Sequence, residues 1–242
     1  MSITITDVTY SFKAKPVLSA INLTLNPGFN VLLGPNGAGK STLLSLLTGQ
    51  RTLQQGNITF ADYDITQETR AIMGQLGVVF QQTTLDLDLT VLQNLTYFGA
   101  LHGLSAALVL ERITPVLTQL ALIERLHDRV RSLNEGHRRR VEIARCMIHL
   151  PQYLLLDEAT VGLDVDSRKL IIEHIRAIVA SQKLTVLWTT HLMDEVLEQD
   201  PLFILNQGKL IEQGLCQSLL LKHQQSSVFD LYRALTQPQG LL

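Results

Sequence analysis

Cysteine is nearly absent from this 242-residue sequence, which contains only Cys146 and Cys216. The two residues lie far apart in the chain, so they provide neither a disulfide framework nor a cysteine-based metal-binding motif. We therefore expect two structural thiols in a protein of the reducing cytoplasm.

An excess of charge of one sign is also absent. The formal net charge is −2, from 20 basic and 22 acidic residues. Nonspecific nucleic-acid binding requires clustered basic charge, and the sequence has one run of three basic residues, at 138–140. We therefore expect no nucleic-acid partner.

Long hydrophobic runs are missing as well. No stretch approaches the roughly 20 consecutive apolar residues of a membrane-spanning helix. Residues 1–6 alternate between polar and apolar, as in an edge strand, and lack the basic and then apolar plan of a signal peptide. Because 46% of the residues are hydrophobic and 17% are charged, we expect a globular chain with a sizeable core.

The spacing of the apolar residues predicts an α/β fold. Residues 3–33 alternate like short strands broken by turns, which indicates an N-terminal antiparallel β layer. From residue 85 to about 150 the apolar positions recur at helical spacing, which indicates an inserted all-helical subdomain. Further strands are predicted at 57–60, 76–80, 153–156 and 184–188, a helix at 166–181, a hairpin at 202–212 and closing helices at 215–236.

A glycine-rich segment follows the apolar strand at 29–33 and precedes a helix at 43–47, which is the context of a P-loop. Its glycines free the backbone to turn successive N–H groups toward a phosphate. Lys40 adds positive charge for the terminal phosphates, and Ser41 offers a hydroxyl to Mg²⁺. A plain glycine-rich turn is the alternative, but the full Gly-x4-Gly-Lys-Ser spacing favours phosphate binding. The predicted nucleotide-binding residues are Gly34, Pro35, Asn36, Gly37, Ala38, Gly39, Lys40, Ser41 and Thr42.

Two acidic residues, Asp157 and Glu158, close the predicted strand at 153–156. In an α/β sheet the carboxyl ends of the strands face the ligand crevice. Asp157 is expected to hold the Mg²⁺ shell, and Glu158 to polarise the attacking water as a general base. Such a pair also serves as a simple helix cap, but a P-loop in the same chain favours the catalytic interpretation.

Two further polar residues follow predicted strands. His191 comes directly after the strand at 184–188 and its two threonines, and it can donate to a γ-phosphate. Gln81 ends the strand at 76–80 and can reach the metal or the attacking water. A lone histidine is often structural and glutamine often caps a loop, so the order of these residues along the chain carries the functional interpretation.

Taken in order, these motifs resemble the nucleotide-binding subunits of the ATP-binding cassette (ABC) transporter family. The resemblance equates residues 34–42 with Walker A, Gln81 with the Q-loop, Asp157 and Glu158 with Walker B and Asp164 with the D-loop. It also equates His191 with the switch histidine and Phe12 with the aromatic residue that stacks on adenine. The alternative is that Phe12 is an ordinary strand aromatic. Its spacing to the P-loop favours Phe12 over Tyr10 as the adenine-stacking residue.

The family's signature segment, Leu-Ser-Gly-Gly-Gln, corresponds to residues 133–137, and here this sequence departs most. In the family the segment caps the γ-phosphate bound by another subunit. The residues implied to act in trans are Asn134, Glu135, Gly136 and His137. Glu135 would repel the phosphate if it pointed inward and would be harmless if it pointed outward. The arginines at 138–140 either face bound phosphate or form a solvated basic surface.

The resemblance implies a P-loop NTPase core at 1–84 and 151–214, with the β layer, a helical subdomain at 85–150 that carries the signature, and C-terminal helices with a frayed tail at 215–242. It also implies an ATPase that uses ATP and Mg²⁺, with Ser41, Gln81 and Asp157 at the metal. The expected partners are a second ATPase subunit, in a homodimer or heterodimer, and an integral membrane permease on whose cytoplasmic face the chain lies.

The form of residues 159–164 and the short C-terminal end resemble exporter-type subunits. The permease contact is expected at residues 81–101. Two alternatives remain: a soluble ABC ATPase without a transport role, and a regulatory subunit that binds ATP without efficient turnover because of Glu135.

Overall fold

The computed structural model describes residues 1–236 and divides the chain into two compact units. The first unit comprises Met1–Ile72 and the chain from Thr185 onward. The second unit is Met73–Leu184. The predicted frayed tail at 238–240 lies outside the described residues.

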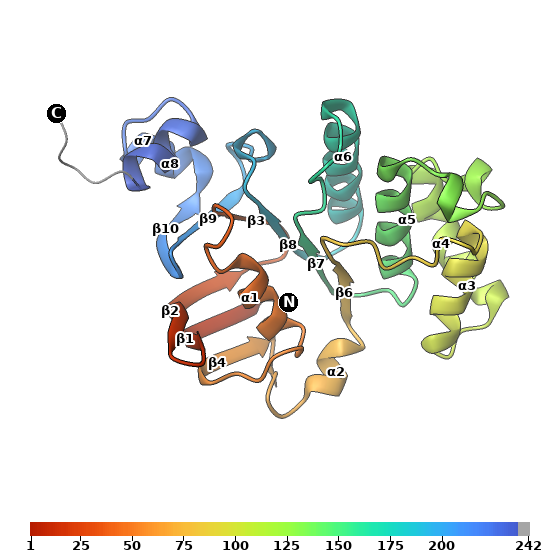
Figure 1. Cartoon of the computed structure of the whole chain (residues 1–242), viewed down its shortest axis with the longest axis horizontal. Coiled ribbons are helices and arrows are strands. Elements are labelled where there is room, and N and C mark those ends of the chain that lie inside the picture. Colours follow the sequence, from red (N-terminus) through yellow and green to blue (C-terminus); the bar gives the residue numbers. More distant parts are fainter. Residues whose placement is uncertain (237–242) are drawn as a thin grey trace. The chain divides into compact units, whose positions relative to one another are not determined.

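The first unit contains two sheets (Figure 1). One is a four-stranded sheet in the order β2-β1-β4-β5. The strands of the other sheet that belong to this unit follow the order β10-β9-β3-β8. Its strands are β1 Ile3–Phe12, β2 Lys15–Leu25, β3 Gly28–Leu33, β4 Gln55–Phe60, β5 Tyr63–Asp64, β8 Thr185–Thr190, β9 Pro201–Asn206 and β10 Lys209–Leu215. Its helices are α1 Lys40–Leu47, α2 Thr69–Met73, which ends at the unit boundary, η3 Met193–Glu195, α7 Cys216–Lys222 and α8 Val228–Thr236.

The antiparallel β layer expected at the N-terminus is confirmed. Strand β1 pairs antiparallel with β2 and β4, and its alternate apolar side chains, Ile3 and Ile5 among them, are buried. This alternation follows from the two-residue period of a strand with one face on the core.

Strand β3 leads into the glycine-rich segment and runs parallel to both β8 and β9. Val31 lies opposite Trp188 and Leu202, and every side chain from Phe29 to Leu33 is buried. A continuous apolar run of this kind fits a strand that is covered on both faces. The pairing continues past the strand, because Gly34 N–H donates to the Thr190 carbonyl at 3.1 Å.

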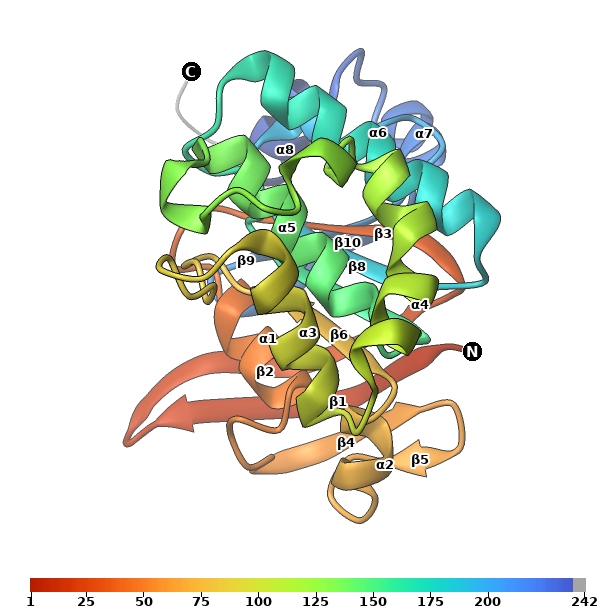
Figure 2. The same cartoon turned by 90° about the vertical axis from the view of Figure 1, so that its right-hand side faces the viewer.

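The second unit holds a parallel strand pair and a group of helices (Figure 2). The predicted helical stretch is confirmed as three α-helices, α3, α4 and α5. The amphipathic helix predicted at 166–181 is also present, with Ile171, Ile175 and Ile178 buried. The elements are β6 Leu76–Val79, α3 Val91–Leu101, α4 Ala106–Gln119, η1 Ile123–Arg125, η2 Val130–Ser132, α5 Glu135–Met147, β7 Tyr153–Asp157 and α6 Val165–Ser181.

Within residues 1–236, no single helix combines the length and apolar composition needed to cross a bilayer. The helices α3 and α4 meet those criteria only together, across a bend of 118°. Both cysteines are buried free thiols, as expected, and burial raises the pKa of each to about 11.

A pair of histidines joins α3 to the end of α5. The rings of His102 and His149 stack with centroids 4.4 Å apart, and Phe98 lies against both. His149 Nε2 lies 3.2 Å from the Leu76 carbonyl, while Nδ1 is buried without a hydrogen-bond partner. Protonation would place an unsatisfied N–H and a charge in the core, so burial, with a smaller contribution from His102, lowers the pKa of His149 to about 4.

This site predicts a pH-dependent stability. The folded-state pKa of His149 lies below the ordinary value of 6.5. Between pH 6.5 and about pH 4, His149 is therefore protonated in the unfolded chain and neutral in the folded chain. The free energy of unfolding should therefore be intact above pH 6.5 and fall as the pH is lowered toward 4. The loss of unfolding free energy caused by His149 should reach roughly 2 kcal/mol at pH 5, at about 1.4 kcal/mol per pKa unit.

Urea unfolding at pH 7.5 and pH 5 measures this loss. The variant His149→Phe, which keeps a flat ring beside His102, should lose less stability on acidification than the wild type. The exposed His127 serves as the control, and His127→Gln should retain the wild-type pH dependence. Equal acid sensitivity of His149→Phe and the wild type would contradict this assignment.

Candidate active site

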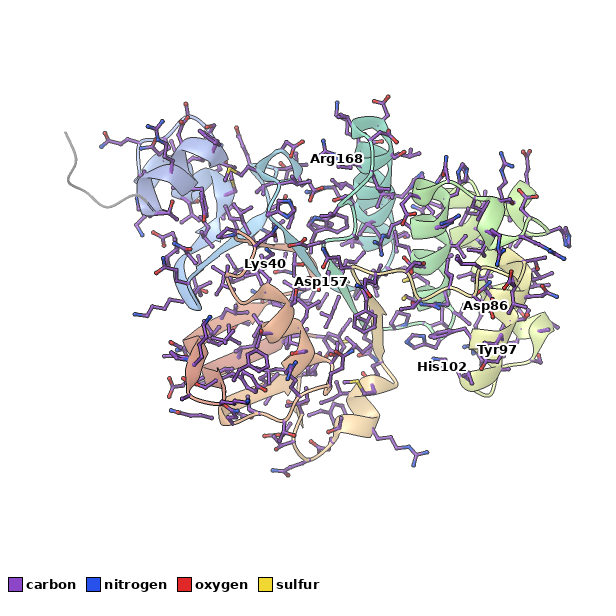
Figure 3. All side chains as sticks on the ribbon, in the orientation of Figure 1. Lys40, Asp86, Tyr97, His102, Asp157 and Arg168 are labelled. Carbon is purple, nitrogen blue, oxygen red and sulfur yellow. The ribbon has the colours of Figure 1, made fainter. Side chains whose placement is uncertain are left out.

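The lysine of the glycine-rich loop in the first unit forms hydrogen bonds back to the start of the same loop. Lys40 is 4% exposed, and its Nζ donates to the carbonyls of Gly34 at 2.6 Å and Pro35 at 3.2 Å. Figure 3 shows Lys40 at the start of α1. An ammonium held in this way is ready to exchange carbonyl acceptors for phosphate oxygens, which form stronger charge-assisted hydrogen bonds.

Two glycines of the loop meet constraints that exclude a side chain. A Cβ at Gly34 would lie 2.4 Å from the Leu205 carbonyl oxygen. Gly39 has φ 111°, in the left-handed region, where L-residues are strained, and a Cβ there would lie 2.7 Å from the Leu18 side chain. Gly39 is also the N-cap of α1, so the loop presents its backbone N–H groups at a helix N-terminus.

Phe12 lies beside the far end of this loop. Its ring lines a cavity of about 400 Å³ together with Ser41 and Thr42. Phe12 is 39% exposed, whereas Tyr10 is 7% exposed and packs edge-on against it with ring centroids 5.2 Å apart. Of the two aromatic residues, Phe12 is therefore the one that a ligand can reach.

His191 follows β8 and lines a second cavity, of about 210 Å³, with the first three residues of the loop, Gly34, Pro35 and Asn36. Tyr232 of α8 lines the same cavity and was not predicted from the sequence. It carries no motif, and its place depends on how the C-terminal helix packs against η3.

The backbone around His191 is anchored by buried polar contacts. Leu192 N–H donates to Thr190 Oγ1 at 2.9 Å. The Trp188 indole N–H donates to Glu195 Oε2, also at 2.9 Å, and both residues are buried. These bonds fix the turn that follows β8 on each side of the histidine.

The acidic pair lies at the end of β7 in the second unit, where every side chain of the strand is buried (Figure 3 labels Asp157). Asp157 and Glu158 are each 7% exposed. The Nε2 of Gln81 donates to Glu158 Oε2 at 3.4 Å, so the structure brings these two predicted residues together. Glu158 adopts φ 48°, a left-handed conformation that is uncommon outside glycine and is often found at functional sites.

The basic run at the start of α5 has a different role from either predicted one. Arg139 is 3% exposed, and its guanidinium donates to the carbonyls of Phe80 and Gln81 at 2.6 and 2.8 Å. It also pairs with the buried Glu142 at 2.7 Å, and Glu142 accepts from Thr84 N–H.

Both interpretations, a phosphate-facing surface and a solvated basic surface, are therefore wrong for Arg139. Arg140 is also buried, and it donates to the Leu120 carbonyl. Because a charge buried in the interior requires nearby acceptors, the chain supplies them here from its own carbonyls and from Glu142. The result is a clamp that fixes residues 80–84 on α5.

The signature-like segment begins α5. Asn134 is the N-cap of the helix, and its side chain accepts from His137 N–H at 2.8 Å. The Glu135 side chain is 50% exposed and lies 3.8 Å from Arg138. Its charge is thus partly offset by an arginine and by solvent. Burial, helped by Arg140 and Arg125, lowers the pKa of His137.

Gly136 connects this segment to the start of α6. A Cβ at this position would lie 3.1 Å from Ser167 Oγ. Ser167 in turn donates through its N–H and hydroxyl to Asp164, the N-cap of α6, and these hydrogen bonds lower the pKa of Asp164. Ser167 therefore lies between Gly136 and the predicted D-loop aspartate.

Comparison with known proteins identifies the family. The family described as ABC transporter matches residues 18–161. The Nod factor export ATP-binding protein I of Rhizobium meliloti (strain 1021) is 38% identical over 96% of this chain and 70% of its own length. The linearmycin resistance ATP-binding protein LnrL of Bacillus subtilis (strain 168) is 35% identical over 84% of this chain. The chain spans about two thirds of the length of LnrL, 66%.

Solved structures show the same fold. The ATP-binding subunit of an ABC transporter superposes with a TM-score of 0.86 at 24% identity, covering 98% of this chain and all of that one. A bacterial Atm1-family ABC exporter with ATP bound gives 0.79 at 25% identity, covering 99% of this chain and 42% of the exporter. The fold is thus that of the P-loop ATPase subunits, as predicted. The chain belongs to the ABC transporter family, as an ATP-binding subunit whose ATPase reaction is coupled to transport.

Proposed function

We propose that the chain hydrolyses ATP bound with Mg²⁺ and thereby drives export through a separate membrane permease. The observation that carries this proposal is the similarity over 96% of the chain to a protein named for Nod factor export. The similarity to LnrL, named for resistance to linearmycin, supports the same direction of transport. The chain would then act at the cytoplasmic face of the membrane, where ATP is available.

The proposed division of labour follows from the chemistry of each group. Lys40 and the backbone N–H groups of the loop bind the phosphates. Mg²⁺ prefers hard oxygen ligands, and the Ser41 hydroxyl, the Asp157 carboxylate and the Gln81 amide supply donors of that kind. When bound, Mg²⁺ would neutralise charge on the transferred phosphoryl group. Glu158 is the general base, and His191 is the donor to the γ-phosphate.

We further propose that two ATPase subunits complete each other's sites. Asn134, Glu135, Gly136 and His137 of one copy would face the nucleotide held by the loop of the other. The half-exposed Glu135, paired with Arg138, is compatible with this arrangement because its carboxylate has a cation beside it. The backbone N–H groups around Gly136 would supply the phosphate contacts.

The proposed contact with the permease lies on the segment from Gln81 to the end of α3. Two large apolar side chains of α3, Tyr97 and Leu101, are 63% and 67% exposed. Figure 3 shows Tyr97 and Asp86 in this part of the second unit. Residues 80–84 are held on α5 through Arg139. A displacement of this segment by the permease would therefore also move Gln81 and the signature-like segment at the start of α5.

Affinity purification of the tagged chain from detergent-solubilised membranes tests the proposal, combined with phosphate release from ATP by the purified complex. We expect an integral membrane protein to co-purify and to stimulate hydrolysis. A chain found only in the soluble fraction with a soluble partner would favour an ABC ATPase without a transport role.

A second candidate function is a regulatory subunit that binds ATP tightly but turns it over poorly, and Glu135 in the signature-like segment favours it. ATP turnover of the unmodified chain with its permease separates the two candidates, because undetectable hydrolysis alongside tight ATP binding would favour the regulatory subunit. The variant Glu135→Gly tests the role of the carboxylate. Because Glu135 is half exposed and paired with Arg138, we expect Glu135→Gly to keep or raise the ATPase rate, by up to about tenfold if it removes a repulsion of about 1.4 kcal/mol. A collapse of the rate would mean that the carboxylate has a positive role in the site.

A further inference from the structure

Arg51, which belongs to none of the sequence motifs, lies over the ring of Phe12. The guanidinium carbon of Arg51 lies 4.4 Å from the ring centroid, which is a cation–π contact. Its Nη1 lies 3.4 Å from the Tyr10 hydroxyl, and its backbone N–H donates to the Ser45 carbonyl at 3.0 Å. Arg51 follows α1, the helix that begins at the phosphate-binding loop, so its backbone is fixed relative to that helix.

The strand that carries the ring is held in place, whereas the arginine side chain is exposed. The Gln54 side chain accepts from Ser11 N–H at 2.8 Å and donates to the Ser11 carbonyl at 3.0 Å. Tyr10 packs edge-on against Phe12 with an interplanar angle of 82°. A long, solvent-exposed guanidinium is therefore the partner that moves when this contact opens.

The covered ring borders the cavity that a nucleotide base would use. Phe12 and Arg51 line the cavity of about 400 Å³ with Ser41 and Thr42, the last residues of the loop. A base stacked on Phe12 would have its centroid about 4.5 Å or more from that of the ring. The Arg51 guanidinium already lies at this distance from the Phe12 ring, in the position that the base would take. Two flat groups cannot stack on the same face of one ring.

We propose that Arg51 competes with the adenine of ATP for the face of Phe12 and is displaced when the nucleotide binds. This inference rests on the proposed binding of ATP at the loop and Phe12. The cost of breaking the Arg51–Phe12 contact lowers the contribution of the base to the affinity. When the nucleotide leaves, Arg51 covers the ring again, so Arg51 determines how strongly the site distinguishes ATP from phosphate alone.

The test compares the dissociation constants of ATP and inorganic triphosphate, measured by calorimetry on the full chain. The ratio of the two constants, triphosphate over ATP, reports the contribution of the base. The loss of one positive charge affects both ligands and largely cancels in the ratio. For Arg51→Met we expect the ratio to rise about two- to fivefold, the equivalent of one exposed cation–π contact.

Two further variants complete the experiment. Phe12→Ala should bring the ratio close to one, and adding Arg51→Met to it should have no further effect, because the contested ring is gone. Arg70→Met removes an exposed arginine elsewhere in the first unit and should leave the ratio at its wild-type value.

A ratio that falls in Arg51→Met would overturn the proposal, because Arg51 would then hold the base in place. An unchanged ratio would overturn it too, provided that triphosphate binding still depends on Lys40. If replacement of Lys40 left the binding of both ligands intact, the nucleotide site itself would be wrong, and the Arg51 proposal would fail with it.

Discussion

Replacing Glu158 by Gln should reduce ATP turnover by about 10²- to 10⁴-fold, the usual contribution of a positioned general base, while ATP still binds. The side chain keeps its size and its reach toward Gln81, so the packing at the end of β7 should survive. The amide cannot accept the proton of the attacking water, and hydrolysis is therefore lost without loss of the nucleotide site. Phosphate release and equilibrium ATP binding, measured on the same preparation, separate the two effects.

The matched control is Glu173→Gln, which neutralises an exposed glutamate of α6 in the same unit and should leave turnover unchanged. Hydrolysis by Glu158→Gln at the wild-type rate would refute the assignment of the base. Turnover lost together with binding would instead show that Glu158 holds the nucleotide.

Replacing Lys40 by Ala should weaken ATP binding by about tenfold to a hundredfold, since hydrogen bonds to charged groups contribute roughly 1.5–3 kcal/mol each. Lys40 is buried and bonded to two carbonyls of its own loop, so its loss also removes a tie that shapes the loop. Calorimetric titration with ATP measures the affinity, and thermal unfolding reports whether the variant remains folded.

Lys209→Ala is the control for this experiment, because it removes an exposed lysine from β10 in the same unit. It should bind ATP as the wild type does. A folded Lys40→Ala protein with unchanged affinity would show that the loop binds phosphate without its lysine.

The fold was largely predictable because its signals are local. The alternation in β1, the continuous apolar run of β3 and the helical spacing of α6 each follow from the period of one element. The geometry of the glycine-rich loop was predictable for the same reason: strand, glycines, lysine and helix are contiguous in sequence. A short segment with fixed spacing carries its geometry with it.

Features that depend on distant partners were not predictable. Arg139 looked like part of an exposed basic run, and only its contacts with the carbonyls of residues 80 and 81 reveal a buried clamp. Tyr232 reaches the cavity beside His191 through the packing of the last helix, and nothing in its own segment indicates this. The left-handed conformation of Glu158 has no local signature either, because the residue is not a glycine.

Phe12 and Tyr10 illustrate an intermediate case. Two residues separated by one position point to the same face of a strand, so periodicity could not separate them. The structure separates them by exposure, since Tyr10 is buried and Phe12 lies at the end of β1 beside the cavity.

We propose that ATP joins two ATPase subunits, which in a homodimer are two copies of this chain, with the loop of one completed by the signature-like segment of the other. The molar mass of Glu158→Gln by light scattering, with and without saturating ATP and Mg²⁺, tests it most directly. We expect a single chain of 27.0 kDa without nucleotide and twice that mass with ATP. A mass that stays at one chain under saturating ATP would contradict it.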